Sequence, residues 1–191
     1  ATTTGEAAEA YRLNLATVHD AYAPAAERAV ALCWVFHLAG DIQQPLHAGH
    51  LISRRFPLSD QAGGKAFVRP QAEAEGVTLH QYWDDAIGGD ADGDANVEAV
   101  RLRLEAAWPR SDLKELDGKA GPDAFHAWAD ESLELAQTVV YNGGTFEGAT
   151  KAVSAEPPPL GYEAARRRVG ERRVALGGHR IADAVRAAFA P

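Results

Sequence analysis

The residues best suited to chemistry in this sequence are histidines and aspartates spaced four apart. His37 and Asp41 share one face if their segment is helical, and so do His80 and Asp84 in a second segment. His47 follows the first pair closely, beyond the point where that helix must end. Imidazole nitrogens and carboxylate oxygens are both good zinc ligands. Two helices and one loop histidine are therefore candidates to surround one or more metal ions.

Spacing alone leaves simpler interpretations open. A single His-x-x-x-Asp pair on a helix is usually a surface ion pair. His37 lies in an apolar stretch with Phe36 and Leu38, so it could equally form a core pair with Asp41 in which both side chains are satisfied. The spacing therefore predicts a metal centre without excluding these roles.

The elements that must position these residues have helical periodicity. Pro24 suits the first turn of a helix, and Thr78 can cap another. Gly177 and Gly178 interrupt the last helix, which predicts a kink or close packing there. We expect no strand pair, and helices at about residues 6–20, 24–43, 78–88, 95–107, 122–141 and 160–189. The sequence predicts an all-α, multi-helix fold that forms a single domain over residues 1–191.

Two segments between these helices lack the helical period. Residues 48–76 are irregular and hold several prolines and glycines, and loops this long inside a compact domain are usually functional or disordered. We expect this long irregular loop to lie beside the metal centre. The segment Asp90–Asp94 resembles a calcium-binding loop, but its glycine is the fourth residue rather than the sixth, so we interpret it as a solvated turn.

Composition narrows the function further. The formal net charge of −8 disfavours a protein that holds long duplex DNA by neutralising its phosphates. A small phosphate ester or a short single strand fits if a bound metal supplies the positive charge. No apolar run is long enough to span a membrane, and residues 1–9 show no signal peptide. Cys33, the single cysteine, is expected to be buried and inert, and Trp34 and Trp83 to pack in the core or around the site.

Two segments, in this order, resemble the zinc-dependent single-strand nucleases of fungi and plants and the related bacterial phospholipases C. His37 to His47 matches the family pattern H-x-x-G-D-x-x-Q-P-L-H at every letter, and Leu79 to Asp84 matches L-H-x-x-W-D. Two later patterns, W-A-x-E-S and G-x-R-[LI]-A, occur at 128–132 and 178–182. The resemblance covers nearly the whole chain.

The resemblance implies an all-α fold with three zinc ions at the bottom of a cleft. His37 and Asp41 resemble ligands of two paired ions, with Asp41 bridging them as the catalytic carboxylate, whereas His47, His80 and Asp84 resemble the protein ligands of the third ion. It also implies that a zinc-activated water hydrolyses single-stranded nucleic acid and 3′-nucleotides. Phospholipid is the alternative substrate, and the family implies a secreted or periplasmic location.

The family's remaining zinc ligands have no counterpart in this sequence. Family members begin with a tryptophan whose amino group and carbonyl bind zinc, and their other ligands precede the region that this chain matches. We therefore expect the chain to lack the N-terminal third of a family member, with that segment or a second chain completing the paired site. The alternative is a metal-binding or inactive helical fragment. Lys65 also departs from the asparagine that usually follows Gly63-Gly64 in the family.

Overall fold

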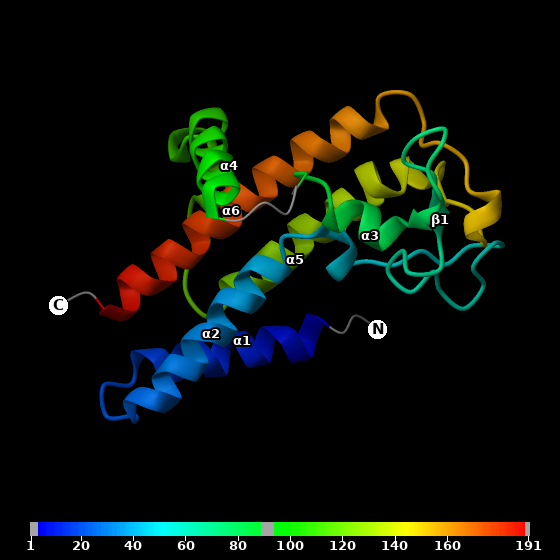
Figure 1. Cartoon of the computed structure of the whole chain (residues 1–191). Coiled ribbons are helices and arrows are strands. Elements are labelled where there is room, and N and C mark those ends of the chain that lie inside the picture. Colours follow the sequence, from blue (N-terminus) through cyan, green and yellow to red (C-terminus); the bar gives the residue numbers. More distant parts are fainter. Residues whose placement is uncertain (1–3, 89–93, 190–191) are drawn as a thin grey trace.

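The computed structural model describes residues 4–88 and 94–189, and these residues form a predominantly α-helical protein (Figure 1). The prediction of an all-α fold is confirmed. The helices within the described residues are α1 (Thr4–His19), α2 (Ala25–Asp41), α3 (Leu79–Asp84), α4 (Asp94–Ala107), α5 (Ala124–Leu135) and α6 (Tyr162–Phe189). A π-helical segment, η4 (Ala136–Val140), continues α5.

Short 3₁₀ turns connect these helices: η1 (Pro45–His47), η2 (Arg110–Asp112), η3 (Lys114–Leu116), η5 (Asn142–Gly144) and η6 (Ala152–Ser154). All six predicted helices are present, although α3 is shorter than expected. The solvated turn predicted at Asp90–Asp94 falls almost entirely on residues outside the described ranges. Within those ranges, no helix combines the length and apolar character needed to cross a membrane.

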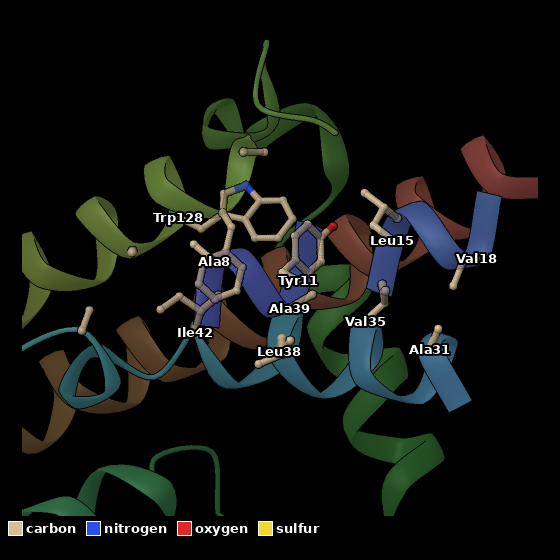
Figure 2. Packing of buried hydrophobic residues seen from close by; sticks show 14 residues of the cluster. Ala8, Tyr11, Leu15, Val18, Ala31, Val35, Leu38, Ala39, Ile42 and Trp128 are labelled. Carbon is tan, nitrogen blue, oxygen red and sulfur yellow. The ribbon is translucent and has the colours of Figure 1, made fainter. Parts of the chain in front are cut away.

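The core that fixes the position of α2 is built from four helices. α1 and α2 pack side by side as an antiparallel hairpin, and α5 and α6 cover the same inner face (Figure 1). Tyr11 of α1 meets Trp128 of α5 edge to face, with ring centroids 5.3 Å apart, above Leu38 and Ile42 (Figure 2). Burying each large apolar side chain stabilises the fold by about 1.5–3 kcal/mol. The end of α2, which leads to the candidate ligands, is therefore anchored by packing.

The outer face of α2 corrects one prediction and narrows another. Cys33 is exposed, not buried. Of the two places expected for Trp34, the core is excluded because the residue is 50% exposed, and its ring lies instead beside His37. The apolar run extends around the whole helix, but only the face that carries Val35 and Ala39 meets the neighbouring helices. Trp83, in contrast, is buried as expected.

A small strand pair also corrects the prediction that no strands would form. β1 (Phe67–Val68) and β2 (Val77–Thr78) pair antiparallel, with Phe67 opposite Thr78. Strands of two residues are too short to display the alternation that identifies a strand in a sequence. The Phe67 backbone also exchanges two hydrogen bonds of 2.8 Å with Ala149, so the loop is held on a second side.

The rest of the loop 48–76 is irregular, as predicted, and it is tied down by a buried carboxylate. Asp60 is fully buried. It accepts hydrogen bonds from the Leu51 backbone N–H at 2.9 Å and from the Tyr141 hydroxyl at 2.8 Å. Because buried charges need such partners, Asp60 ties the first part of this segment to itself and to Tyr141, which follows η4.

Close packing at Gly177 is confirmed. α6 runs without a break through this residue and presses against the end of α2. A Cβ atom at Gly177 would lie only 3.1 Å from Cγ of Gln43, so a side chain there would crowd the Gln43 side chain. The glycine therefore lets α6 reach the turn that carries the candidate ligands.

Candidate metal centre

Local structure explains how the candidate ligands are presented. The Thr78 hydroxyl caps α3 by accepting a hydrogen bond from the Gln81 backbone N–H at 3.1 Å. α3 then presents His80 and Asp84 on one face, with Nε2 of His80 lying 3.7 Å from Oδ2 of Asp84. α2 ends at Asp41, and the turn η1, which begins at Pro45, carries His47 back toward α3.

The structure brings three of the five predicted ligands together. His47 Nε2 lies 3.2 Å from His80 Nε2, and the two rings stack with centroids 5.1 Å apart. One nitrogen from each of these histidines and one Asp84 oxygen all lie within 4.8 Å of one another. The side chains are 24%, 31% and 48% exposed in the order His47, His80, Asp84, so the group opens to solvent on the Asp84 side.

Hydrogen bonding tests whether these residues fit a metal ion. His80 Nδ1 lies 2.8 Å from the Ala62 carbonyl oxygen, which can only accept, so Nδ1 carries the proton. The lone pair of a neutral His80 then sits on Nε2 and faces His47. Two such nitrogens at 3.2 Å need a proton or a cation between them. Ligands about 2.0–2.1 Å from a tetrahedral zinc are separated by roughly 3.3 Å, so the observed spacing fits zinc.

Gln44 holds the third ligand, a role that sequence reasoning missed. Its side-chain amide donates a hydrogen bond to Oδ1 of Asp84 at 3.0 Å, while Oδ2 is the oxygen that faces His80. The amide oxygen of Gln44 also accepts from the Leu46 backbone N–H at 2.5 Å, which fixes the turn. The only sequence signal was the presence of Gln44 in the Q-P-L-H pattern.

Asp41 lies outside this group and contacts it through His47. Oδ2 of Asp41 is 2.8 Å from Nδ1 of His47, although the ring N–H does not point at it well enough to form a hydrogen bond. This contact with His47 lowers the pKa of the Asp41 carboxyl, against the effect of burial. Burial acts to lower the pKa of His47, but its contacts with the Asp41 and Asp84 carboxylates outweigh burial and raise it. Asp41 therefore interacts with His47 from outside the group.

His37 is not brought into the group. It is exposed on the outer face of α2, edge-on to Trp34 with ring centroids 5.8 Å apart. The core pair considered for His37 and Asp41 is therefore wrong. Among the residues that the structure describes, no third ligand joins His37 and Asp41.

The loop 48–76 lies beside the centre, as predicted: its residue Ala62 supplies the carbonyl oxygen that contacts Nδ1 of His80. Gln61 and Ala62 both have positive φ angles, of 54° and 56°, which is unusual outside glycine. A Cβ at Gly63 would lie 2.9 Å from the His80 backbone nitrogen, so only glycine fits this approach. Such backbone strain is typical of segments that serve a site.

Residues of the two downstream sequence motifs, at 128–132 and 178–182, form hydrogen bonds to the residues that follow α2. Ser132 donates to the Ile42 carbonyl at 2.5 Å, and Arg180 donates to the Gln43 side-chain oxygen at 2.7 Å. Arg173, which no motif included, donates to the Gln43 carbonyl at 3.1 Å. These buried hydrogen bonds fix the backbone at Ile42 and Gln43, which leads into the turn that carries His47.

A cavity of about 510 Å³ opens next to the centre. It lies between the ligand turn and α6 and is lined by Asp41, His47, Asp84, Val174 and Ile181, among others. Asp84, the most exposed of the three side chains, therefore borders this cavity together with His47.

The fold and the site define a helical protein with an open His/His/Asp group that could hold a metal ion. The chain belongs to the S1/P1 nuclease family, whose model matches residues 4–190. It is 28% identical over 172 residues to endonuclease 3 of Arabidopsis thaliana, covering 83% of this chain and 51% of the relative. It is 29% identical over 170 residues to endonuclease 4 of the same plant, covering 83% and 50%. The chain thus spans about half the length of the curated relatives it matches.

Proposed function

We propose that this chain contributes to a zinc-dependent phosphodiesterase that hydrolyses single-stranded nucleic acid and 3′-nucleotides. The observation that carries the proposal is the convergence of His47, His80 and Asp84, with the two Nε2 atoms facing each other. Membership of the S1/P1 nuclease family and similarity to two plant endonucleases support the nuclease reaction. The net charge of −8 supports a substrate other than long duplex DNA.

The residues of the centre have separate tasks in this proposal. His47 and His80 would hold zinc through Nε2, and Asp84 through Oδ2. When bound, zinc would supply positive charge for the phosphate and the acidity that makes water nucleophilic near neutral pH. Three protein ligands leave room for water and substrate. The Ala62 carbonyl keeps the His80 proton on Nδ1, and Gln44 holds Asp84.

We further propose that His37 and Asp41 belong to a second, paired site that another segment or a partner chain completes. The exposed face of α2 supports this idea, because it carries His37 beside Val30 and Trp34, which are 60% and 50% exposed. In this arrangement Asp41 would contact both a cation and the His47 ring. Up to three zinc ions would then be bound, as the family resemblance implies.

Hydrolysis assays with purified protein and added zinc test the function. We expect cleavage of a single-stranded oligonucleotide and release of phosphate from a 3′-nucleotide, slower cleavage of the matching duplex, and loss of activity with a chelator. His80→Ala should be inactive, and His50→Ala, which changes an exposed histidine nearby, should be active. Cleavage of phosphatidylcholine instead of nucleic acid would establish the phospholipase alternative. No hydrolysis of any of these substrates would favour a metal-binding module.

Substitution of Asp41 separates a catalytic role from a structural one. Asp41→Asn should lower activity at least about tenfold, because an amide cannot supply two anionic oxygens. The unfolding free energy should change by less than about 1 kcal/mol, since the Asp41 side chain is 42% exposed at the end of a helix. Parallel activity and thermal unfolding measurements distinguish the two. Full activity in the variant would end the proposal for Asp41.

We also propose a secreted or periplasmic location, which the family resemblance supports. Fractionation of the source cells should recover the protein outside the cytosol. Recovery only from the cytosol would contradict this proposal.

A further inference from the structure

A second cavity lies away from the metal centre and shares no lining residue with it. It has a volume of about 390 Å³ and is formed by α1, the segment 119–122, the start of α5 and the C-terminal part of α6. This volume is in the range of small-molecule sites. Its walls are mostly apolar, with Leu15, Ala16, Pro122, Ala184 and Ala187 among them. An apolar body of modest size would therefore fit.

The floor of this cavity carries hydrogen-bond donors without acceptors. The indole Nε1 of Trp128 and the guanidinium Nε of Arg180 are both buried and lack a hydrogen-bond partner. The Arg180 guanidinium lies 5.0 Å from the centroid of the Trp128 ring, so the two donors are close together. In Figure 2 the indole nitrogen is on the edge of the ring turned away from α2. Because both groups can only donate, an acceptor is needed to satisfy them.

Three cationic side chains, Arg12, Lys119 and Arg180, line the cavity with one carboxylate, Asp183, which already pairs with Arg110 at 2.7 Å. Behind the wall, cations again outnumber carboxylates. Glu131 accepts from Lys119 at 2.7 Å, from Arg173 at 2.6 Å and from Arg180 at 2.8 Å, so three cations share one carboxylate. Arg173 and Arg180 are only 4% and 2% exposed. Burial lowers the pKa of Arg180 against the pull of Glu131, which reflects this poorly compensated charge. A buried excess of positive charge is unfavourable unless an anion neutralises it.

The neighbouring phenol adds a further neutral donor. Tyr11 lines the cavity, and burial raises its pKa to about 12, although the Arg180 charge acts in the opposite direction. Its hydroxyl therefore keeps its proton at neutral pH and can donate to an anion.

We propose that this cavity binds a monocarboxylate with an apolar body, of the kind represented by a medium-chain fatty acid. The carboxylate accepts from Trp128 and Arg180, each of which has one buried N–H without a partner. The aliphatic chain lies along Leu15 and Ala184 toward the opening. A phosphate group would need more donors than these to satisfy its oxygens. The site is independent of the proposed hydrolytic function.

Calorimetric titration of the whole chain with octanoate tests the proposal. We expect saturable binding at one molecule per chain. Octan-1-ol, which keeps the chain but lacks the charge, should bind about tenfold more weakly, because charge-assisted hydrogen bonds are roughly twice as strong as neutral ones. Equal affinity for the alcohol and the acid, or no saturable binding of octanoate, would overturn the proposal.

Cavity-filling variants locate the binding. Ala184→Leu on α6 and Ala120→Leu on the opposite wall each place a larger side chain in the cavity, and both should abolish octanoate binding. Ala164→Leu, at an exposed position of α6 outside the cavity, should bind like the unmodified protein. Ala120 is exposed, so its replacement tests the site even if Ala184→Leu disturbs folding. Unchanged binding in Ala120→Leu would place octanoate elsewhere and contradict the inference.

Discussion

Each side chain of the His47–His80–Asp84 group contacts a further residue. His80 and Asp84 are hydrogen-bonded to the Ala62 carbonyl and to Gln44, and Nδ1 of His47 lies 2.8 Å from Asp41. Such outer contacts set which nitrogen of an imidazole is free and keep ligand atoms aimed at one point. The geometry of the group therefore depends on residues outside it, of which Ala62 and Gln44 have no ligand role in the proposal.

Gln44 provides a test of this dependence. Gln44→Ala removes the hydrogen bond to Asp84 and the one that fixes the turn, so zinc affinity should fall about 10–100-fold. Gln81→Ala, at an exposed position on α3, is the matched control and should keep its affinity. Competition with a chromogenic zinc chelator measures both. Equal affinity in the two variants would show that Asp84 does not need Gln44.

At the residue scale, sequence spacing could place His80 and Asp84 on one face but could not find their partners. The 3.7 Å distance between them follows from a helical spacing of four. The contact between Gln44 and Asp84 joins residues 40 positions apart, and it depends on how η1 turns toward α3. Periodicity carries no information on such contacts.

At the scale of elements, one largely buried carboxylate, Glu131, joins α5 to α6 next to the turn that carries the candidate ligands. Glu131 accepts from Arg173 and Arg180, which in turn bind the end of α2 through Gln43. Removing one member of a buried ionic group leaves the others uncompensated. Glu131→Gln should therefore lower the unfolding free energy at pH 7 by about 3–5 kcal/mol. Glu134→Gln, exposed on the same helix, should change it by less than about 0.5 kcal/mol, as urea unfolding can measure.

The stability lost in Glu131→Gln should depend on pH. Burial acts to raise the pKa of the Glu131 carboxyl, but Lys119, Arg173 and Arg180 outweigh burial and hold the pKa below its usual value of 4.5. The folded state thus binds this proton more weakly than the unfolded state does. The stabilisation by Glu131 is complete above pH 4.5 and is lost as the pH falls through the lower folded pKa. The stability difference between the unmodified protein and Glu131→Gln should shrink below pH 4.5, and a constant difference down to pH 3 would contradict this account.

The helices could be predicted because their apolar pattern repeats over many residues. β1 and β2 could not, because each has two residues and shows no repeat. The exposure of Cys33 was missed for a different reason. Its apolar neighbours extend around α2, and a sequence cannot show that only one face of that helix is covered.

At the scale of the whole molecule, the outer face of α2 exposes apolar side chains that a second molecule could cover. Val30 and Trp34 lie four residues apart on one face, 60% and 50% exposed. Val30→Ser with Trp34→Ser should reduce self-association at high concentration, while unfolding free energy changes by less than about 0.5 kcal/mol. Leu58→Ser, at an 88% exposed loop position, is the control. Light scattering during size-exclusion chromatography measures the effect, and a monodisperse monomer before substitution would refute it.

The zinc content of the purified chain tests the central claim most directly. After dialysis against metal-free buffer, we expect at least one zinc per chain, held by His47, His80 and Asp84, and about three if the paired site is complete. His80→Ala should lose one equivalent, with its helical circular dichroism unchanged, whereas His50→Ala should retain the full amount. No bound zinc in the unmodified chain, or equal zinc in His80→Ala, would contradict the account.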